Sequence, residues 1–298
     1  MPDTPTTLPP LALVLPLASA ILYVIGALLL RRAADFGVGF WRTTFVANTI
    51  CAVIYAPLLV MGGTWHWNLV WQPMVAAVLF VGGSILSFLS INKGDVSIAT
   101  PVLGLKIILV ALFSTLLVGQ GTSPRHWAAA ALSTLAVALL NRTRTAQHHH
   151  VTATILAAGS SAAVFALFDV LMQKWAPAWG VGRFLPLMLA FVVVLNLGLI
   201  PMFPAPLTKI DGAAWPWLLA GSIVMGVQSL MFVGSVSYFR EATAANVLYS
   251  SRGLWSVVLV WLIGHWFHNA ERKLGADILA WRLVGAGLLL VAIALVLL

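Results

Sequence analysis

Residues 97–118 read SIATPVLGLKIILVALFSTLLV. The run is apolar from end to end except for one charged residue, Lys106, near its middle. A helix needs about 20 such residues to cross the hydrocarbon core of a bilayer, so this stretch predicts a membrane-spanning helix. A charge at the bilayer centre costs about 2.5–3.5 kcal/mol on insertion scales, so this lysine needs a structural or functional explanation.

The rest of the chain has the same character. Of its 298 residues, 61% are hydrophobic and only 8% are charged, and the mean hydropathy is +1.01. A soluble domain carries about a quarter charged residues, so this composition predicts an integral membrane protein. The net charge is +8, and the 16 Lys and Arg are scattered through short loops, which favours contact with lipid headgroups over binding to nucleic acid.

Ten apolar runs predict an all-α integral membrane fold with ten transmembrane helices. A β-barrel would alternate apolar and polar residues, whereas these runs are continuously apolar. The predicted spans are 9–30, 38–61, 74–92, 97–118, 126–141, 152–174, 184–203, 214–238, 244–266 and 280–298.

The two halves of the chain resemble each other. Gly37-Val38-Gly39 precedes the second span and Gly180-Val181-Gly182 precedes the seventh, and Lys106 in the fourth span has its counterpart, Arg252, in the ninth (252 − 106 = 146). Five spans in each half place the second half in the opposite orientation, so the pattern predicts two inverted five-helix repeats. The predicted organisation is an N-terminal tail (1–8), a first repeat (9–141), a polar linker (142–151) and a second repeat (152–298).

Small residues enter two equivalent spans. Asp95-Val96-Ser97-Ile98-Ala99-Thr100-Pro101 leads into the fourth and Glu241-Ala242-Thr243-Ala244-Ala245-Asn246 into the ninth. With ten spans in two repeats, the chain resembles the drug/metabolite transporter superfamily, in particular its EamA-like branch. The resemblance covers nearly the whole chain and implies transport, while its diffuse motifs leave the substrate unspecified. The chain departs from the common pattern at Gly119-Gln120, where a Gly-Glu is usual.

Lys106 and Arg252 are expected to approach one central cavity from opposite sides. Two cations repel unless an anion lies between them, so the hypothesis is an anionic substrate bearing phosphate or carboxylate. The plastid sugar-phosphate branch of the same superfamily is similar, with basic residues on the fourth and ninth helices. The alternative is that each cation pairs with an acidic residue of the protein. The side chains expected to shape the rest of the pocket are Tyr249, Asn246, Gln228 and Trp255.

Asp169 lies on the stripe Ser161-Phe165-Asp169-Gln173, whose i, i+4 spacing predicts a face turned towards protein or water. Three interpretations stay open: a proton-coupling site, a counter-ion to Lys106 or Arg252, and a partner of Lys174. Arg42, early in the second span, is interpreted as a snorkelling residue more readily than as a cavity residue.

The leading hypothesis is therefore a secondary active transporter of a small organic anion that works by alternating access. The alternatives are a proton-coupled exporter of amino acids or amphipathic drugs, and a flippase of a phosphate-headed lipid. Enzyme motifs are missing, and we expect no cofactor and no metal; His148–His150 are interpreted as part of a solvated linker. The expected partners are a small-molecule substrate and membrane lipids, with the chain a monomer or a homodimer.

The expected location is the cell membrane as a multi-pass protein, with the bacterial inner membrane favoured. Loop charges favour termini outside by the positive-inside rule, whereas the family usually keeps both in the cytoplasm, so the orientation stays open.

Overall fold

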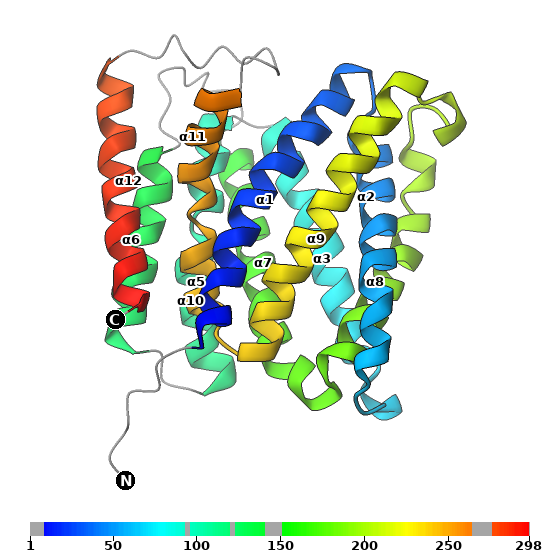
Figure 1. Cartoon of the computed structure of the whole chain (residues 1–298), viewed down its shortest axis with the longest axis horizontal. Coiled ribbons are helices and arrows are strands. Elements are labelled where there is room, and N and C mark those ends of the chain that lie inside the picture. The colour runs from blue at the N-terminus through cyan, green and yellow to red at the C-terminus, as the bar shows by residue number, and fades with distance from the viewer. Residues whose placement is uncertain (1–8, 93–95, 120–122, 141–150, 264–275, 298) are drawn as a thin grey trace.

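A computed structural model describes residues 9–92, 96–119, 123–140, 151–263 and 276–297, and it contains helices and no strands within these ranges (Figure 1). The helices are α1 (Pro10–Asp35), α2 (Phe40–Tyr55), α3 (Trp71–Asn92), α4 (Val96–Leu103), α5 (Lys106–Phe113), α6 (Pro124–Leu140), α7 (Val151–Trp179), α8 (Val181–Leu197), α9 (Trp215–Phe239), α10 (Ala242–Tyr249), α11 (Arg252–Ile263) and α12 (Ala276–Leu297). The predicted all-α fold is confirmed.

Six helical segments of the described chain are long and apolar enough to cross a membrane, and a seventh joins them if α8 and the bent segment after it form one span. These segments correspond to the predicted spans one to four and six to eight. The residues at which α1 begins and α12 ends lie at the same end of the bundle (Figure 1).

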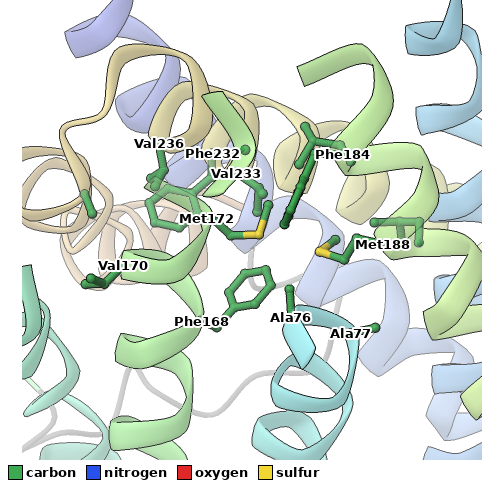
Figure 2. Close-up of a cluster of buried hydrophobic side chains, with 14 of the residues drawn as sticks. Ala76, Ala77, Phe168, Val170, Met172, Phe184, Met188, Phe232, Val233 and Val236 are labelled. Atoms are coloured by element: carbon green, nitrogen blue, oxygen red, sulfur yellow. The ribbon is translucent and has the colours of Figure 1, made fainter. Parts of the chain in front are cut away.

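Helix α7 lies at the centre of the bundle. Half of its most apolar 18-residue stretch is buried, the largest share among the candidate spans. Figure 2 shows its Phe168 and Met172 beside Phe184 and Met188 of α8 and Phe232 of α9. This core holds in place the helix that carries Asp169.

Glycines let pairs of helices approach closely where α1 meets α9. A Cβ on Gly26 would lie 2.8 Å from Met225 Cγ, and one on Gly221 would lie 2.7 Å from Leu30 Cδ2. A Cβ at either position would require Met225 or Leu30 to shift, so the glycines permit this close approach of the two helices. The first helix of the chain is thereby fixed against a helix of its second half.

The fourth predicted span is confirmed as a single candidate span, Ile98–Val118, but it contains a two-residue break in the α-helix, and the described part of the ninth predicted span contains a similar break. Helix α4 ends at Leu103 and α5 begins at Lys106, whereas α10 ends at Tyr249 and α11 begins at Arg252. At each break the backbone turns with the tighter i to i−3 hydrogen bonds of a 3₁₀ turn. The fourth span also ends in a π-helical segment, Ser114–Val118.

The seventh predicted span, 184–203, is also not a single straight helix, because a 49° bend separates α8 from the segment that starts at Ile200. Several sequence features lie outside the described residues: the tail 1–8, Gly94-Asp95, Gln120, the histidines of the linker, and the end of the ninth predicted span beyond Ile263.

Candidate functional site

Lys106 and Asp169 form a buried ion pair. The Lys106 Nζ lies 2.7 Å from Asp169 Oδ2, with the two side chains 17% and 3% exposed. The same carboxylate oxygen accepts a hydrogen bond from Asn246 Nδ2 at 2.7 Å, and that amide nitrogen also donates to the Ala242 carbonyl at 3.0 Å. Three helices, α5, α7 and α10, therefore meet at one carboxylate.

Aromatic rings surround the ammonium group of Lys106. Its Nζ lies 5.7 Å from the ring centroid of Phe165 and 5.3 Å from that of Phe232. A ring face attracts a cation by about 0.5–2 kcal/mol, depending on how far the pair is removed from water. The lysine is thus held by one charge partner and two ring contacts.

Arg252 has a different environment. Its guanidinium carbon lies 4.7 Å from the ring centroids of both Tyr23 and Tyr249. Among the described residues, Arg252 forms no salt bridge. The Tyr249 hydroxyl donates to Gln228 Oε1 at 3.2 Å, and Ser19 Oγ donates to the same oxygen at 3.1 Å.

The charges of Lys106, Asp169 and Arg252 sum to +1. The sequence left two possibilities for the cations, an anion between them or pairing with an acidic residue of the protein, and Lys106 is paired with Asp169. Of the three interpretations of Asp169, the geometry fits the counter-ion to Lys106. Lys174 instead donates to the Leu117 carbonyl at 2.7 Å.

The remaining predicted residues are distributed as follows. Tyr249, Gln228 and Asn246 are all buried within this network, and Trp255 packs partly buried against the same core. Arg42 lies elsewhere: it is 6% exposed and donates to the Gly37 carbonyl at 2.6 Å, so it holds the turn between α1 and α2. The stripe from Ser161 to Gln173 faces the protein interior, as predicted.

Sequence reasoning missed Tyr23, Ser19 and Phe232. Each is an uncharged aromatic or hydroxyl residue in α1 or α9, so no charge inside the apolar span marks it. The two hydroxyl groups in the apolar α1, four residues apart and so on one face, were the available signal.

Two adjoining pockets open at the end of the bundle where α7 and α9 finish. One of about 380 Å³ is lined by Val118, Gln173, Lys174, Pro177, Ala178 and Arg240. Its neighbour of about 300 Å³ shares Pro177 and Arg240. Lys106, Asp169 and Arg252 line neither pocket.

Glu241, which precedes α10 at this same end, is partly buried. Burial raises the pKa of its carboxyl above the ordinary value of 4.5, because a charged carboxylate is poorly solvated there. Within the described chain, no group of three or more His, Cys, Asp and Glu could hold a metal ion.

Residues 10–142 match the family of EamA-like transporters, which confirms the family resemblance over that part of the chain and indicates a multi-pass membrane transporter. No curated protein matches the chain. A crystal structure of another protein aligns over 96% of this chain and 96% of its own, with a TM-score of 0.66 and 18% sequence identity. At this identity the match shows a shared fold and nothing of the substrate.

Proposed function

We propose that this chain, whose first half is of the EamA-like transporter family, is a secondary active transporter of a small organic anion bearing phosphate or carboxylate. In this proposal ten helices form two inverted five-helix repeats, and alternating access carries the anion between them. The observation that carries the proposal is Arg252, a cation at a helix break with two tyrosine rings and no salt bridge among the described residues.

The matching helix breaks support the inverted repeat. The Gly104 N–H bonds to the Thr100 and Pro101 carbonyls, and 146 residues later the Ser250 N–H bonds to the Asn246 and Val247 carbonyls. The next bonds repeat the same offset: Leu105 to Val102 and Ile107 to Gly104 correspond to Ser251 to Leu248 and Gly253 to Ser250.

Packing around the breaks also supports the repeat. Ala111, on the half-helix after the first break, shares a buried cluster with Ala244, on the half-helix before the second. Contact between opposite halves of two equivalent broken helices is what an antiparallel arrangement of the repeats requires. Broken helices of this kind hold substrate sites in many secondary transporters.

Arg252 suits an anion by its chemistry. Its guanidinium offers a planar fork of donors that matches carboxylate and phosphate oxygens. It stands at the first residue of α11, where the helix dipole adds partial positive charge. Because Asp169 already neutralises Lys106, Arg252 supplies the +1 that a substrate anion would balance.

A thermal-shift screen of purified protein in detergent tests this proposal with phosphorylated and carboxylated metabolites, alongside cationic controls. Organic anions should raise the Tm of the wild type and of Arg252→Lys, and should leave Arg252→Gln unchanged. The control is the double variant Lys106→Met/Asp169→Leu, which changes the ion pair but keeps the net charge. Stabilisation of Arg252→Gln by the same anions would overturn the proposal.

A second function is favoured by one observation, the direct contact of Asp169 with Lys106. A carboxylate that exchanges a lysine for a proton could drive a proton-coupled exporter of amino acids or amphipathic drugs. In proteoliposomes with an imposed pH gradient, Asp169→Asn would then abolish transport while Arg252→Gln would not. The opposite ranking supports the anion transporter.

The membrane we propose is the bacterial inner membrane, because the described residues form apolar helices and not the alternating strands of an outer-membrane barrel.

A further inference from the structure

The pocket of about 380 Å³ has a basic lining. Its two charged residues are both cations, Lys174 on α7 and Arg240 between α9 and α10, and its other lining residues carry no charge. Both cations are exposed to solvent. The pocket therefore presents positive potential at the mouth of the bundle.

The backbone at Arg240 adds a second observation. Arg240 ends α9 with φ at 62°, the only non-glycine residue of the described chain with positive φ. This left-handed conformation is uncommon for a residue other than Gly, Asn or Asp. Gly would fit this cap without strain, so the geometry of the cap does not account for an arginine at this position.

Gln173 forms the inner wall of the pocket and ties three segments together. It is 6% exposed, and its Oε1 accepts hydrogen bonds from Ser114 Oγ at 3.2 Å and from the Ala242 N–H at 3.1 Å. One turn deeper on α7 lies Asp169, which binds Asn246, one turn deeper on α10. Helices α7 and α10 are thus joined at two successive turns, first at the pocket and then at the ion pair.

We propose that this pocket is an anion-binding vestibule of the transport path, in which Lys174 and Arg240 attract the substrate anion and Gln173 closes the way to the Lys106–Asp169 pair. The vestibule deepens the proposed function and rests on it. Its ligand class is the small organic anion, bound loosely and by charge. Breaking the Gln173 contacts frees α10 from α7 at the turn nearest the pocket, which opens the path to the buried pair.

Thiol labelling tests the vestibule without knowledge of the substrate. Cys51 is the sole cysteine of the chain and is buried, so Cys51→Ser gives a background free of thiols. In it, Ala178→Cys places a thiol in the pocket. We compare its rates of reaction with anionic sulfonatoethyl and cationic trimethylammonioethyl methanethiosulfonate, each divided by the rate with a free thiol.

The anionic reagent should react faster by about tenfold at low salt, the lower range of electrostatic steering. The preference should fall towards unity in Lys174→Gln/Arg240→Gln and at high salt. The control Lys209→Gln removes an exposed charge from the loop between α8 and α9 and should leave the preference unchanged. An equal rate for both reagents, or a preference that survives the double neutralisation, overturns the vestibule.

A second thiol tests the closure. Phe165→Cys lies beside Lys106, one turn deeper on α7 than Asp169. Its labelling by the anionic reagent should accelerate several-fold when Gln173→Ala is added. The control Gln72→Ala removes a different buried glutamine, whose Oε1 accepts from Trp179 Nε1, and should have no effect.

If Gln173→Ala is too unstable to purify, the milder variant Ser114→Ala takes its place, because it removes only one of the two hydrogen bonds to Gln173. Labelling of Phe165→Cys should then accelerate by a smaller factor. An unchanged rate in both variants overturns the closure by Gln173. These labelling results are separate from the Arg252 test. If anions no longer stabilise Arg252→Gln but the pocket thiol reacts equally with both reagents, the transporter proposal holds and only the vestibule is excluded.

Discussion

At the scale of single residues, the Lys106–Asp169 pair predicts strong coupling between two substitutions. Lys106→Met leaves a buried carboxylate without its cation, which costs about 3–5 kcal/mol in known buried pairs. Asp169→Leu leaves the buried ammonium group of Lys106 without its carboxylate. The double variant removes both charges, so its Tm should lie above that of either single variant. Additive losses in a thermal-unfolding cycle would show that the two charges do not interact.

Glu241 predicts a pH dependence of stability. Its folded pKa is raised, so as pH rises from the unfolded value of 4.5 through the folded value, the unfolded chain gives up its proton first and the folded state loses stability. Glu241→Gln should therefore raise the Tm at pH 8 and leave it unchanged at pH 4. Thermal melts across this range decide the matter, and an equal effect at both pH values would contradict it.

The sequence identified which charges lie inside the apolar spans but not which groups lie next to them. The shared offset of 146 residues identified Lys106 and Arg252 as equivalent positions. It could not show that Asp169 faces one of them and that Tyr23 lies beside the other, because those neighbours are set by how α7 and α1 rotate within the bundle. Spacing along one helix fixes a face; the partner of that face depends on packing between helices.

At the scale of elements, the break before α5 depends on Gly104. A Cβ there would lie 2.8 Å from Val137 Cγ1 and 2.9 Å from the Pro101 carbonyl oxygen. Gly104→Val should therefore destabilise the protein by about 1–3 kcal/mol, as overpacking generally does. Gly287→Val on α12 is the control, because nothing lies within 4 Å of its Cβ position. Equal Tm values for the two variants would contradict a tight fit at the break.

The breaks themselves were not predicted. Hydropathy is blind to a two-residue change from α-helical to 3₁₀ hydrogen bonding, since the side chains on both sides stay apolar. The pair Pro101 and Gly104 was a local hint in the fourth span, whereas Ser250-Ser251 gave none in the ninth. A break in the ninth span could have been predicted only by aligning the two halves and assuming that the ninth span breaks where the fourth does.

At the scale of the whole molecule, five spans in each half predict where three reporters lie. Reporters fused at the two ends of the chain should be on the same side of the membrane, and one inserted in the linker 142–151 should be on the opposite side. Paired fluorescent and periplasmic-phosphatase fusions measure this directly. A linker reporter on the same side as both ends would exclude the division into five and five spans.

The net charge of +1 carried by Lys106, Asp169 and Arg252 together has a consequence for how the membrane voltage acts on the proposed transporter. When the empty carrier reorients, it moves a net charge of +1 across part of the membrane field. Moving one full charge across 100 mV changes the free energy by about 2.3 kcal/mol. A carrier loaded with a monovalent anion is electroneutral. The membrane voltage would then change the rate at which the empty carrier reorients, but not the rate at which the loaded carrier reorients. One-for-one exchange of monovalent anions would proceed at any membrane potential, whereas net transport of the anion would be electrogenic.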